Sequence, residues 1–220
     1  MIRVVIADDH TIVRDGLKQL LLGAGGFDVV GEARDGHEVL RHVRETDFDV
    51  LLLDVSMPGK SGLELIKQVK SERTKLRILV LSMHQEHQYA VRAIRSGASG
   101  YVTKESATTQ LVSALRKVAS GGAYITAEVA EQLALGAMPG SDGPPHALLS
   151  DREFQIFRLL AGGVAVSDIA HQLNLSVKTI STHKARLMQK LGITNPAELV
   201  RYALRHRLID EADSAPRKDE

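Results

Sequence analysis

Three carboxylates, one hydroxyl and one amine occur where apolar runs of the sequence end. Asp8 and Asp9 follow IRVVIA, Asp54 ends DVLLLD, Ser82 ends LRILVLS, and Lys104 follows ASGYVT. If these residues meet, their charge needs compensation, because two carboxylates about 4 Å apart repel by roughly 4 kcal/mol at an effective dielectric of about 20. Lys104 supplies one positive charge. A divalent cation can compensate the negative charge that remains. Ligands that are all oxygen, without His or Cys, favour Mg²⁺ over zinc.

The apolar runs alternate with amphipathic stretches through the first 120 residues, so the sequence predicts five strand-then-helix units. VLLLD and ILVLS are continuously apolar, which is typical of strands that helices cover on both faces. We therefore expect an α/β fold with a doubly wound, five-stranded parallel sheet of the flavodoxin-like type. In such a sheet, residues at the carboxyl ends of the strands share one pocket. The expected strands are residues 2–7, 27–33, 49–54, 76–82 and 98–103.

The stretch VLLLDVSMPGKSG, residues 50–62, predicts how Asp54 is presented. Met57-Pro58-Gly59 turns the chain directly after the strand, so we expect the Asp54 carboxylate to be exposed at the rim of the sheet. A carboxylate in that position can attack a phosphohistidine if positive charge neutralises the phosphoryl oxygens. His10, which follows the acidic pair, is expected to be a rim residue.

The residues at these strand ends resemble the signature of a response-regulator receiver domain over residues 1–120. The resemblance implies that Asp54 accepts a phosphoryl group from a sensor histidine kinase and that Lys104 pairs with the phosphoryl oxygens. It implies that Ser82 bonds the new phosphoryl group and that Tyr101 rotates inward behind it. It also implies a Mg²⁺ site whose ligands are Asp8, Asp9, Asp54 and the backbone carbonyl of Ser56. The motifs that carry the resemblance are Asp8-Asp9, Asp54-Val55-Ser56-Met57-Pro58, Gly62, Ser82 and Gly100-Tyr101-Val102-Thr103-Lys104.

Residues 148–211 predict a small all-α domain of four helices. Ser150 is expected to cap the first helix, with Glu153 three residues later in the capping-box position. VSDIAHQL, the turn Asn174-Leu175-Ser176, and SVKTISTHKARLMQKLG predict a helix-turn-helix, whose second helix enters a DNA major groove. Residues 148–210 contain nine Lys and Arg against five Asp and Glu, which is compatible with a polyanion partner. The apolar side of the second helix, expected to pack, consists of Val177, Ile180, Leu187 and Leu191.

The stretches LSDREFQIFRLLAGG and SVKTISTHKARLMQKLG closely resemble the LuxR-type DNA-binding domain. The whole chain therefore resembles a NarL/FixJ-type response regulator, which implies that phosphorylation controls binding to double-stranded promoter DNA. The resemblance makes Ser181, Thr182 and Ala185 the base-edge positions. The residues that it assigns to phosphates are Lys178, Lys184, Arg186 and Lys190, and Thr179 is included among the DNA-binding residues.

The composition predicts the domain organisation and the compartment. We expect a receiver domain at residues 1–120, a helix and flexible linker at 121–147, a DNA-binding domain at 148–211 and a disordered tail at 212–220. The absence of Cys excludes disulfides, thiol catalysis and Cys-ligated metal. Asp8 and Asp9 interrupt the apolar start of a signal peptide, and no apolar run reaches the roughly 18 residues of a membrane span. We therefore expect a cytoplasmic protein without a membrane partner.

The final helical stretch, NPAELVRYALRHRLI, predicts the oligomeric state. It contains more apolar length than four small helices can bury, so we expect a homodimer when the protein is phosphorylated. A two-fold dimer reads paired DNA half-sites.

Three other functions are compatible with parts of the sequence. An aspartate-nucleophile phosphatase has a similar sheet but needs a second acid two residues after the nucleophile, where this chain has Ser56. A regulator with a vestigial receiver binds DNA without phosphorylation of Asp54. An adaptor that uses the helix-turn-helix for protein contacts shows no salt-dependent DNA binding. The response-regulator interpretation predicts no enzymatic activity besides phosphotransfer to Asp54 and its reversal.

Overall fold

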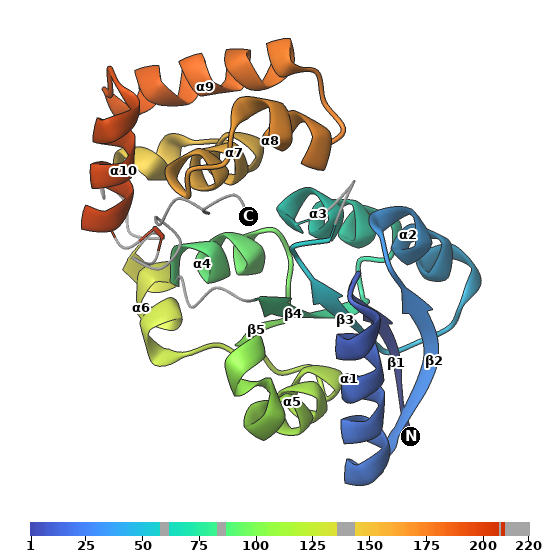
Figure 1. Ribbon diagram of the computed structural model, residues 1–220. Helices are drawn as coiled ribbons and strands as arrows, with labels where there is room; N and C mark the ends of the chain where they lie inside the picture. Colours follow the sequence, from blue (N-terminus) through green and yellow to red (C-terminus); the bar gives the residue numbers. More distant parts are fainter. Residues whose placement is uncertain (58–61, 83–86, 136–143, 207, 210–220) are drawn as a thin grey trace. The chain divides into compact units, whose positions relative to one another are not determined.

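The computed structural model describes residues 1–57, 62–82, 87–135, 144–206 and 208–209 (Figure 1). The chain divides into two compact units, residues 1–133 and 134–220. The predicted tail, residues 212–220, lies outside the described residues, as do residues 136–143 of the predicted flexible linker. Pro58 and Gly59 of the predicted turn also lie outside them.

The N-terminal unit is built on a five-stranded sheet in the order β2-β1-β3-β4-β5, in which all neighbouring strands are parallel. A helix follows each strand and returns the chain across a face of the sheet (Figure 1). This arrangement confirms the predicted doubly wound α/β fold. The strands are β1 (Ile2–Ala7), β2 (Phe27–Ala33), β3 (Val50–Asp54), β4 (Arg77–Ser82) and β5 (Gly100–Thr103).

Helices cover both faces of this sheet, with α1 and α5 on one face and α2, α3 and α4 on the other (Figure 1). Every residue of β3 is buried, which explains the continuous apolar run in its sequence. Ile6, Leu52 and Leu111 belong to the core that the sheet forms with α1 and α5. The helices are α1 (Thr11–Ala24), α2 (Gly36–Glu45), α3 (Gly62–Glu72), α4 (His87–Arg95) and α5 (Lys104–Ala119).

The register of the strands brings their carboxyl ends to one edge of the sheet. Ala7, the last residue of β1, pairs with Leu53, and Asp54 pairs with Leu81. Ser82 pairs with Thr103, the residue that precedes Lys104. Asp8, Asp54 and Lys104, which end or follow these strands, therefore lie at one edge of the sheet, although they are far apart in the sequence.

The segment after α5 extends the sheet edge before it becomes helical. The Tyr101 N–H donates to the Tyr124 carbonyl at 2.9 Å, and Tyr124 N–H donates to the Ser99 carbonyl at 3.0 Å. The sequence predicted a helix and a flexible linker within residues 121–147, and the helix, α6, spans Ala127–Leu135, after Tyr124 has bonded to β5.

The described part of the C-terminal unit is all-helical, as predicted. Ser150 Oγ accepts the Glu153 N–H while the Glu153 side chain accepts the Ser150 N–H, which confirms the capping box. Between α8 and α9, Asn174 has a φ of 52°, a conformation that Asn tolerates better than most residues. The elements are η1 (Pro145–Leu148), α7 (Asp151–Ala161), α8 (Val166–Gln172), α9 (Val177–Leu191) and α10 (Pro196–Arg205).

The packing side of α9 differs from the predicted one at a single residue. Ile180, Leu187 and Leu191 are buried, as expected. Val177, however, is 53% exposed. It is the first residue of the helix, one turn before Ile180, where fewer neighbouring turns can cover a side chain.

The apolar residues of α10 are better covered than the sequence suggested. Leu199 and Ala203 are buried, and Val200 and Leu204 are half-buried. No large apolar side chain in the described part of α10 is exposed, so this helix does not provide the predicted surplus of exposed apolar surface. Among the described helices, none has both the length and the apolar character that crossing a membrane requires.

Candidate functional site

Lys104 joins two fully buried carboxylates at the carboxyl edge of the sheet. Its Nζ donates to Asp8 Oδ2 at 2.6 Å and to Asp54 Oδ2 at 2.7 Å. The side chains of Asp8 and Asp54 have no exposed surface, and that of Lys104 is 13% exposed. These residues follow or end β1, β3 and β5, so the parallel sheet brings them together as the sequence predicted.

Asp54 is buried, whereas the sequence predicted an exposed carboxylate at the rim. Its Oδ1 accepts the Ser56 N–H at 2.9 Å, and Lys104 covers its Oδ2. The Ser56 N–H and the Lys104 ammonium therefore occupy both oxygens of the buried carboxylate. Burial raises the pKa of Asp54, and the hydrogen bonds from Lys104 and Ser56 offset part of this rise.

Lys104 is the cation of this pocket. Burial lowers the pKa of its ammonium, but hydrogen bonds to Asp54 and Asp8 outweigh burial and leave the pKa above its usual value. Lys104 is therefore protonated at neutral pH. A single ammonium faces the carboxylates of both Asp8 and Asp54, with Asp9 beside them.

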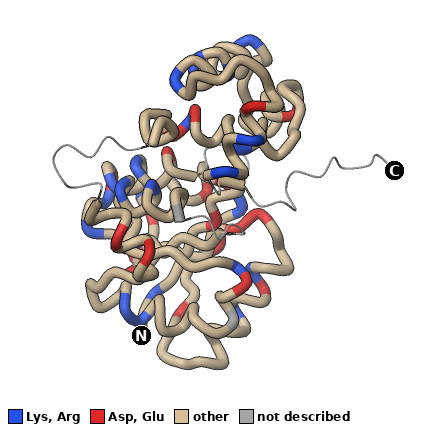
Figure 2. The backbone as a smooth tube through the Cα atoms, turned by 90° about the vertical axis from the view of Figure 1, so that its left-hand side faces the viewer, with Lys and Arg blue, Asp and Glu red and all other residues tan. Residues whose placement is uncertain are grey.

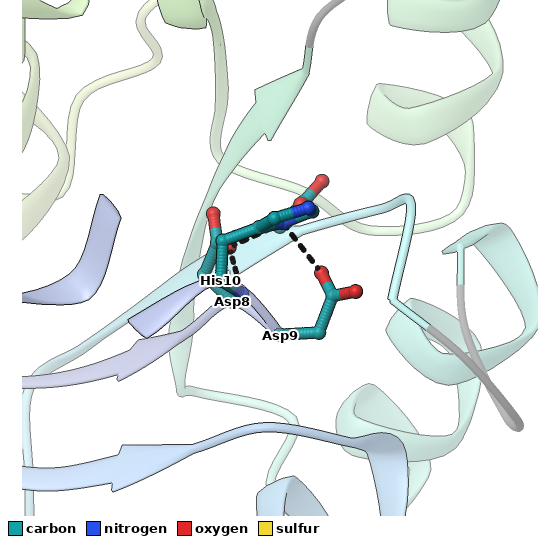
Figure 3. A group of neighbouring side chains, drawn as sticks. Asp8, Asp9 and His10 are labelled. Atoms are coloured by element: carbon teal, nitrogen blue, oxygen red, sulfur yellow. Dashed lines mark hydrogen bonds and ion pairs between the residues drawn. The ribbon is translucent and has the colours of Figure 1, made fainter. Parts of the chain in front are cut away.

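Asp9 and His10 complete a cluster of four groups in this pocket (Figure 3). One ligand atom from each of Asp8, Asp9, His10 and Asp54 lies within 4.8 Å of the others. Asp9 Oδ1 is buried and accepts no hydrogen bond from the residues that the structure describes. His10 is 66% exposed, but its Nδ1 lies 3.1 Å from Asp9 Oδ1 and 3.3 Å from Asp8 Oδ1. The pocket thus includes an imidazole nitrogen, which the sequence prediction of oxygen ligands omitted.

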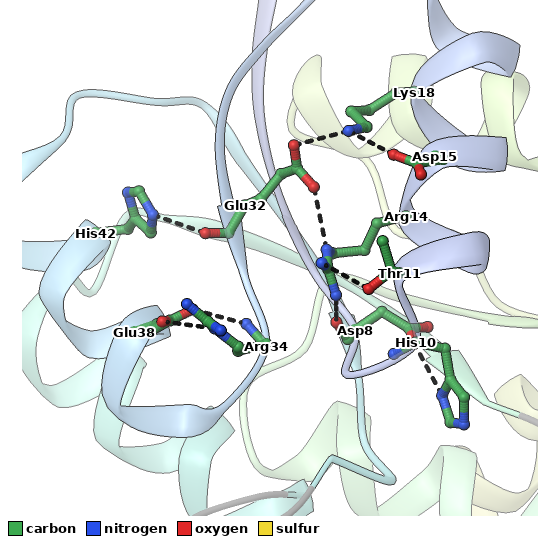
Figure 4. A network of polar contacts seen from close by, with 10 residues as sticks. All are labelled: Asp8, His10, Thr11, Arg14, Asp15, Lys18, Glu32, Arg34, Glu38 and His42. Carbon is green, nitrogen blue, oxygen red and sulfur yellow. Dashed lines mark hydrogen bonds and ion pairs between the residues drawn. The ribbon is translucent and has the colours of Figure 1, made fainter.

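A network on α1 and β2 holds the loop that carries Asp8 (Figure 4). Arg14 Nη1 donates to the Asp8 backbone carbonyl at 2.7 Å, and Arg14 Nε donates to Glu32 Oε2 at 3.0 Å. Lys18 Nζ donates to the other Glu32 oxygen at 2.8 Å, and this bond lowers the pKa of Glu32. The sequence analysis missed this network; the i, i+4 spacing of Arg14 and Lys18 on α1 is the signal that points to it.

Ser82 lies on β4, the strand next to that of Asp54, and Tyr101 lies on β5, one strand further away. Ser82 ends β4 and is fully buried, and it pairs with Thr103 directly before Lys104. Tyr101 lies on β5 with 8% of its surface exposed, and it pairs with Val80. Ser82 is therefore at the edge of the pocket, and Tyr101 is two residues further back along its strand.

The helix α9 carries the predicted DNA-binding residues of the C-terminal unit. It contains four basic residues and no Asp or Glu; Figure 2 marks the charged positions along the backbone. Thr179 and Lys184 are half-buried. The exposed members of the predicted set are Lys178, Ser181, Thr182, Ala185, Arg186 and Lys190.

Some of these residues also have partners within the C-terminal unit. The Thr179 N–H donates to Ser176 Oγ at 3.0 Å, which caps α9. Lys190 Nζ donates to Glu153 Oε2 at 2.6 Å and to the Leu148 carbonyl at 3.3 Å. The sequence did not predict this link between α9 and the start of α7. The assignment of Lys190 to a DNA phosphate stays a prediction.

Two family models match the chain. The model described as the response regulator receiver domain matches residues 4–116. The model described as bacterial regulatory proteins, luxR family, matches residues 147–203. The chain belongs to the response regulators. Its N-terminal unit contains the receiver domain, with an acidic pocket at the carboxyl edge of the sheet, and its C-terminal unit contains the LuxR-type helix-turn-helix domain.

Named relatives are similar to this response regulator over nearly its whole length. UvrY of Escherichia coli is 39% identical over 211 residues, which are 96% of this chain and 97% of UvrY. GacA of Pseudomonas aeruginosa is 38% identical over 213 residues, which are 96% of this chain and 100% of GacA. A structure of RcsB from Salmonella enterica serovar Typhimurium, bound to promoter rprA in the presence of the phosphomimetic BeF3⁻, is 34% identical with a TM-score of 0.66. That match covers 92% of this chain and 98% of RcsB.

Proposed function

We propose that this response regulator accepts a phosphoryl group on Asp54 from a sensor histidine kinase and then binds double-stranded promoter DNA through α9. The observation that carries the proposal is the Lys104 ammonium, which bonds the buried carboxylates of both Asp8 and Asp54. An amine 2.7 Å from an Asp54 oxygen is close enough to pair with phosphoryl oxygens attached to that residue.

Asp54 supplies the nucleophile in the phosphotransfer. One carboxylate oxygen forms a bond to phosphorus while the P–N bond of the phosphohistidine breaks and the donor imidazole leaves. The protein contributes position and charge, because Ser56 N–H holds one Asp54 oxygen and Lys104 holds the other. Hydrolysis of the acyl phosphate restores the Asp54 carboxylate. Turnover of an external substrate is not part of the proposed function.

The carboxylates beside Lys104 fit a divalent cation. Their negative charge exceeds that of one ammonium, and Asp9 Oδ1 is a buried oxygen without a hydrogen bond among the described residues. We assign Asp8, Asp9, Asp54 and the backbone carbonyl of Ser56 to Mg²⁺, which prefers oxygen ligands. When bound, this cation neutralises charge on the transferring phosphoryl group.

Ser82 and Tyr101 are assigned to the response that follows phosphorylation. The Ser82 hydroxyl bonds the phosphoryl group, and Tyr101 moves inward behind it and changes the surface formed by α4 and β5. A shift of a two-state domain from 1:99 to 99:1 requires about 5.5 kcal/mol of differential stabilisation. Bonds from a doubly charged phosphoryl group to Ser82 and Lys104 can supply energy of this order. The buried position of Ser82 at the edge of the pocket supports its assignment.

The helix α9 is assigned to the DNA major groove. The exposed Lys178 and Arg186 contact phosphates, and Ser181, Thr182 and Ala185 approach base edges. Lys184, Lys190 and Thr179 are secondary candidates because each is half-buried or bonded within the domain. RcsB, a relative of 33–34% identity, has been solved on promoter DNA and as dimers on DNA, which supports a promoter site and a homodimer here. Binding to promoter DNA assigns the protein to the cytoplasm.

Footprinting with and without a phosphodonor tests this function on DNA selected from a random pool. Acetyl phosphate with MgCl2 should add one phosphoryl group to the wild type, detected by intact mass, and should tighten its DNA binding. Asp54→Asn should show neither effect, whereas Asp28→Asn, at an exposed carboxylate on β2, should show both. Equal affinity of Asp54→Asn and the phosphorylated wild type overturns phosphorylation as the control.

The same experiment separates the alternative functions. Absence of a mass shift on Asp54, with DNA binding intact, supports a vestigial receiver. Turnover of a generic phosphate ester that depends on Asp54 supports a phosphatase. DNA binding that does not weaken with added salt supports a protein adaptor, because phosphate contacts release counterions and make affinity salt-dependent.

A further inference from the structure

We propose that His10 supplies an imidazole nitrogen to the cation pocket and shifts its preference from Mg²⁺ toward borderline transition ions such as Mn²⁺ and Co²⁺. This inference rests on the proposed cation site at Asp8, Asp9 and Asp54. It concerns which divalent ion that site selects. The supporting observation is that His10 Nδ1 faces two of the three carboxylates, as Figure 3 shows.

The distances from His10 Nδ1 match those between ligands of one ion. Nδ1 is 3.1 Å from Asp9 Oδ1 and 3.3 Å from Asp8 Oδ1. Adjacent ligands about 2.1 Å from an octahedral ion are about 3.0 Å apart, so the imidazole already has the spacing of a neighbouring ligand. Asp9 Oδ1, the closer of these oxygens, is buried and accepts no hydrogen bond from the described residues, and its contact with His10 Nδ1 is an ion pair only when the imidazole is protonated.

The local structure leaves the His10 ring available for this role. The His10 backbone N–H donates to Asp8 Oδ1 at 2.8 Å, which fixes the start of the side chain beside the pocket. The side chain is 66% exposed, so it does not belong to the packed core. Its ring can therefore adjust by small rotations while its backbone remains anchored.

The chemistry of the ligand decides which ions gain affinity. Mg²⁺ prefers oxygen and keeps several waters, whereas imidazole suits first-row transition ions. For a given mixed nitrogen and oxygen site, affinity rises from Mn²⁺ to Co²⁺. A nitrogen ligand from His10 therefore strengthens binding of Co²⁺ and Mn²⁺ more than binding of Mg²⁺.

Calorimetric titration of the full-length protein with MgCl2, MnCl2 and CoCl2 tests the proposal. His10→Ala should lower the ratio of Co²⁺ affinity to Mg²⁺ affinity by about tenfold or more, since even loss of an outer-shell partner costs about 10–100-fold in metal affinity. His37→Ala, which removes another exposed imidazole of the receiver domain, should leave the ratio unchanged. A ratio that His10→Ala leaves unchanged overturns the proposal and shows that the imidazole is only a neighbour of the carboxylates.

Electron spin echo measurements on bound Mn²⁺ provide a direct signature of the ligand. The wild type and His37→Ala should show coupling to an imidazole ¹⁴N nucleus, and His10→Ala should lose this coupling. Coupling that persists in His10→Ala, or that is absent from the wild type, contradicts coordination by His10. Circular dichroism of the variant verifies that it is folded.

Asp54→Asn separates failure of this inference from failure of the proposed function. If the three ions bind and Asp54→Asn weakens all of them, the cation site stands and the result for His10→Ala decides the inference alone. If Asp54→Asn leaves all three affinities unchanged, the cation site of the proposed function fails, and the inference about His10 fails with it.

Discussion

Lys190 on α9 is bonded to Glu153 on α7, with 2.6 Å between Lys190 Nζ and Glu153 Oε2. The same carboxylate oxygen accepts the Ser150 N–H at 2.8 Å. Glu153 therefore completes the cap of α7 and also holds the last turn of α9. Since its side chain is 5% exposed, this contact links the helix assigned to DNA to the interior of its own domain.

Glu153→Gln should lower the free energy of unfolding of the C-terminal unit by about 1–2 kcal/mol at pH 7. The amide can still accept the Ser150 N–H, but the Lys190 ammonium then bonds a neutral oxygen and the attraction of the ion pair is lost. Hydrogen exchange of the amides in α7 and α9 measures the change. Glu131→Gln, at an exposed carboxylate on α6, is the matched control and should leave that exchange unaltered.

The pKa of Glu153 predicts how this stability depends on pH. Burial raises the pKa, but hydrogen bonds from Lys190 and Ser150 outweigh burial and hold it below the usual value. Because its pKa is lower in the folded state, ionised Glu153 stabilises the fold at pH values above the unfolded pKa of about 4.3. This stability is lost as the pH falls through the folded-state pKa. The difference in stability between wild type and Glu153→Gln should therefore shrink below about pH 4.3. A difference that stays constant down to pH 3 argues against the ionised pair.

Lys104→Met should destabilise the receiver domain by about 3–5 kcal/mol in the absence of divalent ions, because it leaves the buried carboxylates of Asp8 and Asp54 without their cation. Urea unfolding of the full-length protein, followed by hydrogen exchange in the strands, measures the loss. Lys75→Met, at an exposed lysine, should cost far less. MgCl2 should restore more stability to Lys104→Met than to the wild type, and equal restoration speaks against a cation site at these carboxylates.

Lys178 and Lys190 should differ in their effect on DNA binding. Lys178→Ala should weaken binding to all sequences and reduce the salt slope by about 1, as expected for loss of one phosphate contact. Lys190→Ala should change the slope less, since its ammonium is bonded to Glu153. Affinity is measured by fluorescence anisotropy at several salt concentrations, with the folded fraction of each variant determined by circular dichroism. Equal slopes for the two variants restore Lys190 as a phosphate contact.

Gly62 and Tyr89 should be coupled in a double-mutant cycle. Gly62 has a φ of 63°, and a Cβ there meets the Tyr89 hydroxyl at 2.8 Å. Gly62→Ala should cost about 1–2 kcal/mol from the backbone conformation alone, with the clash in addition. Because Tyr89→Phe removes the clashing oxygen, Gly62→Ala should cost less in that background. Urea midpoints of the four proteins measure the coupling, and additive costs exclude the steric contact.

Much of the fold was predictable because the relevant interactions are local. Continuous apolar runs such as VLLLD predicted buried strands, and all five strands lie where they were expected. The Ser150 and Glu153 capping box joins residues three positions apart, so its residue types were sufficient to predict it. The meeting of Asp8, Asp54 and Lys104 was also predictable, because the carboxyl ends of parallel strands share one edge whatever the details of packing.

The tertiary structure alone decided the burial and the partners of the functional side chains. Asp54 is buried and not exposed, because Lys104, 50 residues away, covers its carboxylate. Lys190 bonds Glu153 across 37 residues, and Nδ1 of the largely exposed His10 ring lies 3.1 Å from Asp9 Oδ1. These contacts depend on how helices and loops pack after the strands and helices form. A pattern of neighbouring residue types determines which face of an element is apolar, but only packing determines which charged atoms lie within hydrogen-bonding distance.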